Sequence, residues 1–198
     1  MIKNVIFDIG NVLLDFCWKD HIARFGFQGE KADRIAQAMM LGPIWPKLDL
    51  GLESDEDILE QFVAHTPELE QEIRLVFSDL STIVREYEGS VDWIESLKAR
   101  GYHTYYLSNY GERIRREASK ELSFLSHMDG GIMSYTVHLA KPDPAIYQTL
   151  LDRYGLKAEE CVFLDDTVRN VEAAQALGIA GIVVISQEQA KKELETLL

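Results

Sequence analysis

The sequence has few cysteines and no long hydrophobic run. Its 198 residues include only Cys17 and Cys161, which are far apart and in no spacing typical of metal ligands. We expect two free thiols in a reducing compartment rather than a disulfide-stabilised fold. The apolar run at the N-terminus stops at Asp8, too early for a signal peptide, and no run is long enough to cross a bilayer. A cytoplasmic protein outside the membrane is therefore expected.

Positive charge is also scarce. Lysine and arginine total 20 against 33 acidic residues, which gives a formal net charge of −13 and a pI near 4.8. A nucleic-acid-binding protein needs a basic surface, so that class is set aside. Hydrophobic residues make up 46%, as in a globular core, and the length suits one domain with a smaller insertion. The sequence contains nothing that determines the oligomeric state.

Short apolar runs that end in polar residues predict the strands of a parallel sheet. Their β-branched and aromatic residues favour buried strands over 5–7, 104–107, 161–164 and 182–185, with a weaker fifth over 131–135. Helical spacing of apolar residues predicts helices over 90–100, 144–154 and 167–177. Strands that alternate with helices in this way indicate an α/β protein with a Rossmann-like, doubly wound parallel sheet.

One long segment interrupts the alternation. From about Trp18 to Arg85 no strand is predicted, whereas helical patterns cover 30–41, 54–65 and 67–84. Ser54 and the acids that follow it resemble a helix-capping sequence. We expect an inserted helical cap over 17–85, with a catalytic core made of 1–16 and 86–198.

Polar side chains follow the predicted strands where the strands end. They are Asp8, Ser108, Asn109, Asp165 and Asp166, and Lys141 lies on a loop before the helix at 144–154. Ligands of open parallel sheets bind at the carboxyl ends of the strands. Carboxylate oxygens suit Mg²⁺, and a lysine with a hydroxyl suits a phosphate group. The combination predicts a site for a phosphate and a metal ion.

Each of these residues has an ordinary alternative explanation. Asp8 and the pair Asp165 and Asp166 could cap turns or helices, and Lys141 could be a solvated surface residue. Two adjacent acids behind a buried strand are, however, unfavourable unless a cation lies nearby. The joint occurrence of the groups therefore favours the functional interpretation.

The order of these motifs resembles that of the haloacid dehalogenase superfamily, most of whose members are phosphatases. The four motifs are Phe7-Asp8-Ile9-Gly10-Asn11-Val12, Leu107-Ser108-Asn109, Lys141-Pro142 and Phe163-Leu164-Asp165-Asp166, with Asn170 beyond. The chain is most similar to a helical-cap phosphatase branch that includes α-glucose-1-phosphatase and the N-terminal phosphatase domain of epoxide hydrolase. The resemblance implies a Rossmann-like fold with a cap inserted after the first motif.

The resemblance also implies roles for individual residues. Asp8 corresponds to the nucleophile and to a Mg²⁺ ligand, and the carbonyl of Gly10 corresponds to a second ligand. Asp166 corresponds to the direct metal ligand of the fourth motif and Asp165 to its outer-shell partner, although their order could be reversed. Ser108, Asn109 and Lys141 correspond to the substrate-binding group, and Lys141 also offsets charge at Asp8.

One position departs from the pattern of the family. Its phosphatases usually carry a second aspartate two residues after the nucleophile, which protonates the leaving group and then activates water. Gly10 stands there in this chain, and loss of such acid–base help costs roughly 10²–10⁴-fold in rate. Asp15 is the nearest acidic substitute, as a turn residue or as a catalytic residue on a folded-back hairpin. Alternatively, Mg²⁺ and ordered water replace the acid.

The sequence is compatible with three functions. The favoured function is a Mg²⁺-dependent phosphatase for a small phosphorylated metabolite, first of all a sugar phosphate. A haloacid dehalogenase is the second, although its chemistry needs no metal and leaves the doubled acid unexplained. A non-catalytic phosphate-binding regulatory protein is the third, because of Gly10. Trp18 and Trp45 of the insertion are expected to pack in its core, with a lesser expectation that they contact substrate.

Overall fold

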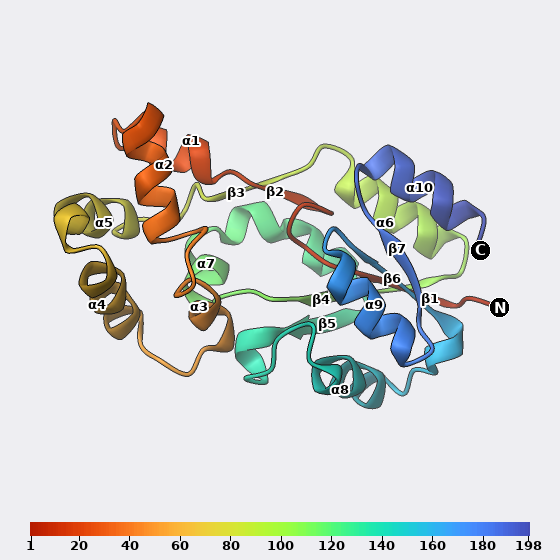
Figure 1. The fold of residues 1–198 in the computed structure, drawn as a ribbon. Helices are drawn as coiled ribbons and strands as arrows, with labels where there is room; N and C mark the ends of the chain where they lie inside the picture. The colour runs from red at the N-terminus through yellow and green to blue at the C-terminus, as the bar shows by residue number, and fades with distance from the viewer.

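A five-stranded parallel sheet forms the centre of the molecule (Figure 1). The computed structural model describes all 198 residues. The strands are β1 (Asn4–Phe7), β4 (His103–Ser108), β5 (Gly130–Met133), β6 (Cys161–Asp165) and β7 (Ala180–Val183), in the order β5-β4-β1-β6-β7. Strand β1 is central and pairs with both β4 and β6 in parallel register. The expected doubly wound sheet is confirmed.

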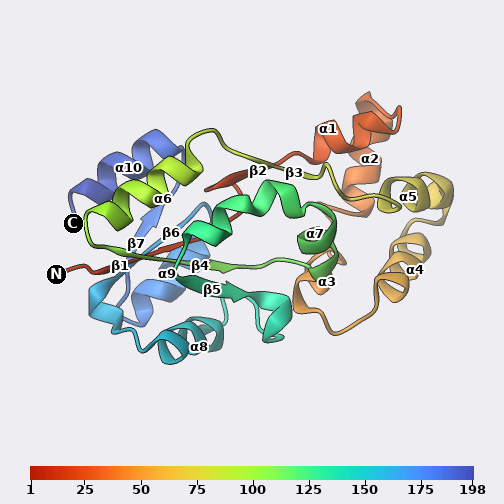
Figure 2. The ribbon, with the colours of Figure 1, turned by 180° about the vertical axis from the view of Figure 1, so that it is seen from behind.

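Alternate residues of β1 face opposite layers of helices. Val5 and Phe7 pack toward α6 (Ser90–Ala99) and α10 (Gln187–Glu195), whereas Ile6 packs toward α8 (Pro144–Tyr154) and α9 (Val168–Ala176). The Phe7 ring meets the Trp93 ring edge-on, with centroids 4.9 Å apart. Because both faces are covered, the strands are apolar throughout, as buried parallel strands require. Figures 1 and 2 show these two layers from opposite sides.

Local sequence accounts for the best-predicted helix, whereas pairing with a distant strand accounts for the least accurately predicted strand. Asp143 caps α8 by accepting a hydrogen bond from the Ala145 amide at 2.9 Å, and Gly155 ends the helix in a left-handed conformation. Strand β7 begins two residues earlier than expected, because pairing with β6 sets its register. Ile185, which was expected inside it, is 86% exposed.

A group of helices lies between two short strands, β2 (Leu14–Phe16) and β3 (Val84–Glu86). The helices are α1 (Trp18–Arg24), α2 (Gly29–Ala38), α3 (Pro46–Leu50), α4 (Asp55–His65) and α5 (Glu70–Phe77), with a 3-10 turn at Pro67–Leu69. They lie beyond the end of the sheet that is opposite the N-terminus (Figures 1 and 2). Strands β2 and β3 pair antiparallel, so the expectation of no strand before Arg85 was wrong for Val84 and Arg85.

The helix expected over 67–84 also ends earlier than predicted, at Phe77. Asp79 accepts a hydrogen bond from the Ser81 amide at 2.9 Å, and Glu117 accepts one from the Leu80 amide at 2.7 Å. These side chains give the backbone partners that a continued helix would otherwise supply. The chain therefore turns toward β3 instead of continuing as a helix.

Several short elements were not predicted, because they are too short to show a periodic pattern. Besides α1, α3, β2 and β3 they include α7 (Glu112–Glu117) and 3-10 segments at Ser119–His127, Ser134–Thr136 and Ala158–Glu160. Both cysteines are buried free thiols, as expected. No helix has the combination of length and apolar composition that a membrane span requires.

Candidate active site

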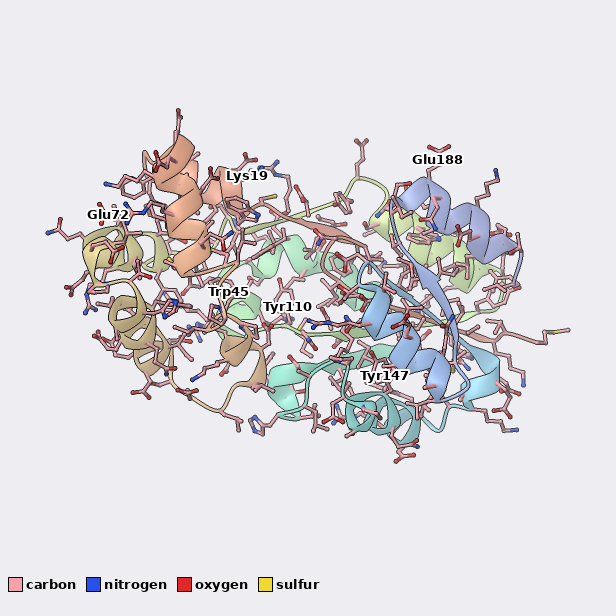
Figure 3. The ribbon with its side chains drawn as sticks, viewed as in Figure 1. Lys19, Trp45, Glu72, Tyr110, Tyr147 and Glu188 are labelled. Atoms are coloured by element: carbon pink, nitrogen blue, oxygen red, sulfur yellow. The ribbon has the colours of Figure 1, made fainter.

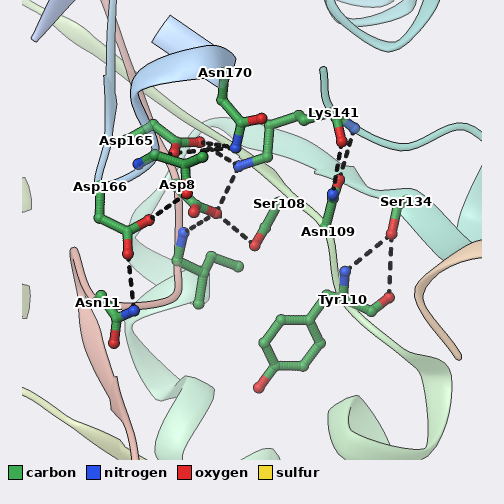
Figure 4. A network of polar contacts seen from close by, with 12 residues as sticks. Asp8, Asn11, Ser108, Asn109, Tyr110, Ser134, Lys141, Asp165, Asp166 and Asn170 are labelled. Atoms are coloured by element: carbon green, nitrogen blue, oxygen red, sulfur yellow. Dashed lines mark hydrogen bonds and ion pairs between the residues drawn. The ribbon is translucent and has the colours of Figure 1, made fainter. Parts of the chain in front are cut away.

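Asp8 stands directly after β1, where its amide donates a hydrogen bond to the Leu164 carbonyl of β6 at 2.8 Å. One carboxylate oxygen, Oδ1, accepts from three donors: the Ile9 amide at 2.7 Å, Ser108 Oγ at 2.7 Å and Lys141 Nζ at 2.9 Å (Figure 4). Oδ2 has no hydrogen-bond partner. The carboxylate is thus held at one oxygen and free at the other, on the wall of a cavity.

Lys141 lies between two acids. Its Nζ is 2.9 Å from Asp8 Oδ1 and 2.7 Å from Asp165 Oδ2, and its side chain is only 1% exposed. The Asn109 side chain holds the lysine's backbone from both sides, donating to its carbonyl at 3.0 Å and accepting from its amide at 2.8 Å. The oxygen and the nitrogen of the Asn109 amide are therefore both engaged with the backbone of Lys141. This favours a role for Asn109 in positioning Lys141 rather than the direct contact with substrate that was expected from the sequence.

Asp165 is fully buried and surrounded by donors. Besides Lys141, it accepts from the Thr167 amide at 2.8 Å, and Asn170 Nδ2 lies 3.1 Å from both of its oxygens (Figure 4). A carboxylate with this many donors has little capacity left for a metal ion. Its arrangement suits a residue that orients Lys141.

Asp166 is more accessible and lines the cavity. It accepts from Asn11 Nδ2 at 2.8 Å and from Thr167 Oγ1 at 3.2 Å. Asn11 adopts a positive φ of 55°, a conformation that asparagine tolerates better than most residues. Asn11 lies within the first motif, and no role was predicted for it from the sequence; in the structure it lies against Asp166.

The charges in this cluster do not balance. Carboxylate oxygens of Asp8, Asp165 and Asp166 lie within 4.8 Å of one another, with Lys141 as the counter-charge. Burial, reinforced by the charge of Asp165, raises the pKa of Asp8 to about 6 although Lys141 opposes the rise. Burial acts to lower the pKa of Lys141, but the two acids outweigh it and the pKa is raised. A further cation would stabilise the ionised form of Asp8.

The cavity beside Asp8 has a volume of about 240 Å³, which suits a small molecule. Six of its 14 lining residues form what we call the apolar wall: Leu14, Phe16, Trp45, Val84, Tyr110 and Ile114. The others are polar or acidic residues and Gly10. Trp45, from the inserted helices, and Tyr110, which follows β4, are labelled in Figure 3. Trp18 is not part of the lining.

Asp49 on α3 also lines the cavity, although no functional role was predicted for it from the sequence. Burial, together with the charge of Asp8, raises the pKa of Asp49 to about 7, while Lys141 acts to lower it. Pro46 in the first turn and Gly51 after the last are signals that could have located α3. No local pattern could have shown that this helix reaches the cavity.

Asp15 does not reach the cavity. Its neighbours in β2, Leu14 and Phe16, line the cavity, so strand alternation directs Asp15 to the other side. Its carboxylate accepts instead from the Cys17 thiol at 3.2 Å. Residues 9–14 form a turn, in which the Leu13 and Leu14 amides donate to the Ile9 carbonyl, and β2 then pairs with β3. This arrangement does not support the catalytic role considered for Asp15.

Comparison with known sequences assigns the family. The chain matches the family described as haloacid dehalogenase-like hydrolase over residues 2–178. It belongs to this family. The expected resemblance is therefore confirmed, and the protein is a hydrolase of the haloacid dehalogenase-like type.

Its relatives have diverse names. Mouse acyl-CoA dehydrogenase family member 10 is 32% identical across 99% of this chain, which spans only 19% of that protein. Sesquiterpene phosphatase astK of Aspergillus oryzae is 25% identical, covering 99% of this chain and 96% of its own length. The (S)-2-haloacid dehalogenase 1 of a Pseudomonas strain is 24% identical over 89% of this chain and 82% of its own length.

Solved structures of the family share the fold. A haloacid dehalogenase-family enzyme of Bacteroides thetaiotaomicron, crystallised with magnesium and inorganic phosphate, superposes with a TM-score of 0.70 at 22% identity. The match covers 92% of this chain and 93% of the other. At this identity the similarity establishes the architecture alone.

Proposed function

We propose that this hydrolase is a Mg²⁺-dependent phosphatase that cleaves a small phosphorylated metabolite through an acyl phosphate on Asp8, in which the phosphoryl group is bonded to a carboxylate oxygen. The observation that carries the proposal is the asymmetry of the Asp8 carboxylate. Three donors orient it through Oδ1, and Oδ2 remains without a partner beside the cavity. An oriented carboxylate with one free oxygen is what in-line attack on phosphorus needs.

The donor set fits a magnesium ion. It consists of oxygens alone, three carboxylates face one lysine, and Asp8 is difficult to ionise without a further cation. Asp8, Asp166 and the carbonyl of Gly10 would hold the ion. Bound Mg²⁺ would offset the negative charge of the carboxylates and of the phosphate.

Exchange of Asp166 for Asn is expected to weaken Mg²⁺ binding by about 100-fold or more. Asp165→Asn is the matched control and should cost only about ten-fold, because Asp165 acts on the ion through its neighbours. Calorimetric titration with Mg²⁺ measures both. Equal effects, or a larger effect at Asp165, would show that the roles of the two acids are wrongly assigned.

The protein's own residues account for the first chemical step. Ser108 Oγ and Lys141 Nζ, now on Asp8, lie where they can also donate to phosphate oxygens. Asp8 attacks phosphorus as the bond to the leaving oxygen breaks, and water then cleaves the phosphorylated aspartate. Asp165 and Asn109 keep Lys141 in place through both steps.

We further propose that residues 17–85 form a cap that selects the substrate. The apolar wall contains Trp45 from this segment and Tyr110 from the catalytic core, so the segment and the core would contact the same ligand. Aromatic rings can pack on a sugar ring, which supports a sugar phosphate. The same wall favours, as a second candidate, a phosphate ester with an apolar body.

Trp45→Ala is expected to change KM for different phosphate esters by unequal factors, on the order of ten-fold for those that fill the wall. Trp18→Ala, a tryptophan of the same segment outside the cavity, is the control. Steady-state kinetics on a sugar phosphate and an aryl phosphate provide the comparison. A uniform change across substrates would mean that Trp45 only packs, against Phe16 and Phe62.

A phosphate-release screen over sugar, alkyl, aryl and isoprenoid phosphates tests the function as a whole. Release is expected with Mg²⁺ and should stop with a chelator. Halide release from 2-haloacids without metal would instead indicate a dehalogenase. Phosphate binding without any release would indicate the non-catalytic alternative that Gly10 raises.

A further inference from the structure

The residue at position 10 leaves an acid–base role unfilled. Glycine has no side chain, and a Cβ at Gly10 would meet no atom within 4 Å, so no neighbouring side chain occupies the space. The acids that line the cavity are Asp8, Asp49 and Asp166. Asp8 is the proposed nucleophile, and Asp166 is held by Asn11 and Thr167 on the proposed metal side.

Of the three acids that line the cavity, Asp49 alone has no role assigned so far. Its carboxylate makes no hydrogen bond and no ion pair, although it is half-buried in a cavity wall. Burying an uncompensated carboxylate is unfavourable, so a structural role alone does not explain its presence. It comes from α3 in the inserted segment, whereas Asp8 directly follows strand β1, so the two acids approach the cavity from different parts of the fold.

Helix α3 is fixed firmly against the core. Ser134 Oγ donates to the Asp49 carbonyl and also accepts from the Tyr110 amide at 2.9 Å. His138 Nδ1 donates to the Leu50 carbonyl at 2.8 Å. Ser134 thus ties the backbone of Asp49 to Tyr110, in the loop that follows β4, the strand that ends at Ser108.

Two glycines allow α3 and the core to pack closely against each other. A Cβ on Gly51 would lie 2.9 Å from Tyr135 Cβ, and one on Gly111 would lie 3.3 Å from Leu48 Cβ. Gly51 also has a positive φ of 61°, which other residues rarely adopt. The chain therefore holds Asp49 at a set position in the wall of the cavity that Asp8 also lines, rather than on a mobile loop.

We propose that Asp49 is the general acid–base that replaces the aspartate missing at position 10. This inference rests on the proposed phosphatase function. In the first step the Asp8–phosphorus bond forms, the bond to the leaving oxygen breaks, and the Asp49 carboxyl gives its proton to that oxygen. In the second step the Asp49 carboxylate takes a proton from water, which attacks phosphorus and releases Asp8 and inorganic phosphate. Asp49 is then protonated again, so the cycle balances.

The environment of Asp49 agrees with this assignment. Its pKa, raised to about 7, gives both protonation states appreciable populations near neutral pH, as a group that alternately donates and accepts needs. Leaving oxygen and attacking water occupy the same side of phosphorus in successive in-line steps, opposite Asp8. One residue on that side can therefore serve both.

The test compares wild type and Asp49→Asn on β-glycerol phosphate, a poor leaving group, and p-nitrophenyl phosphate, a good one. We expect kcat/KM to fall by about 10²–10⁴-fold on the alkyl ester and by less than about ten-fold on the aryl ester, because nitrophenolate leaves without a proton. A burst of nitrophenolate should precede slow turnover, since the second step still lacks its base. Asp15→Asn is the matched control and should leave both rates near wild type.

A second variant separates chemistry from structure. Gly10→Asp added to Asp49→Asn should restore much of the rate on the alkyl ester, because the open space at Gly10 accepts a side chain. Equal losses on both esters, or no loss, would overturn the assignment while the phosphatase function stands. A wild-type protein that releases phosphate from neither ester nor from any in the screen would overturn the function and the assignment together.

Discussion

Replacement of Asp8 by Asn is expected to lower phosphate release by roughly 10⁵-fold or more while the protein remains folded. The amide is close in size to the carboxylate and can still accept from Ile9 and Ser108 through its oxygen. It cannot act as the nucleophile. Rates with the best ester of the screen, measured with Mg²⁺, give the comparison, and circular dichroism reports the fold.

Asp15→Asn is the control for the same chemical change seven residues further on, outside the cavity. It should retain wild-type turnover. If Asp8→Asn kept more than about one hundredth of the wild-type rate, another group would have to attack phosphorus. The covalent mechanism would then be wrong even if the protein remained a phosphatase.

Replacement of Lys141 by Met is expected to destabilise the protein by about 3–5 kcal/mol and to abolish turnover. The ammonium is nearly inaccessible and lies 2.9 Å from Asp8 and 2.7 Å from Asp165. Its removal leaves two buried carboxylates without compensation. Urea unfolding without metal at pH 8 measures the loss.

Lys3→Met provides the control. Lys3 pairs with Glu160 at 2.7 Å but is 59% exposed, so its loss should cost at most about 1 kcal/mol. Similar losses for the two variants would mean that Lys141 does not neutralise buried charge.

The effect of Lys141→Met should depend on pH. The folded-state pKa of Asp8, about 6, lies above its ordinary value of 3.8, so the folded protein binds a proton between these values that the unfolded chain has released. The contribution of this proton to the free energy of unfolding therefore increases as the pH falls through 6. Without Lys141 the pKa should rise further. The destabilisation should thus be largest at pH 8 and smaller at pH 5.

The sequence was sufficient to locate the sheet and the core of the site. Apolar strands that alternate with helices form a parallel sheet, in which the carboxyl ends of the strands lie at the same edge. Asp8, Ser108 and Asp165 were therefore expected to lie close together. The structure brings them together with Lys141 between Asp8 and Asp165. The family motifs suggested roles for these residues. They did not show the different hydrogen-bond partners that distinguish the role of Asp165 from that of Asp166.

The rest of the site depends on contacts between distant segments. Asp49 belongs to a five-residue helix, too short for a periodic pattern, and its position depends on docking against Ser134 and Tyr135. Asn109 was expected to contact substrate, but its engagement with the Lys141 backbone is a tertiary contact over 32 residues. Ribbon β2–β3 likewise joins residues that are about 70 apart, and only this pairing turns Asp15 away from the cavity.

Acid quench during turnover tests the central claim most directly. The wild-type protein, mixed with Mg²⁺ and p-nitrophenyl phosphate, should yield after digestion a peptide containing Asp8 that is heavier by one phosphoryl group. Asp49→Asn should raise the fraction of modified peptide, and Asp8→Asn should remove the modification. Rapid phosphate release with no modified peptide in either wild type or Asp49→Asn would contradict the account, because water would then attack the substrate directly.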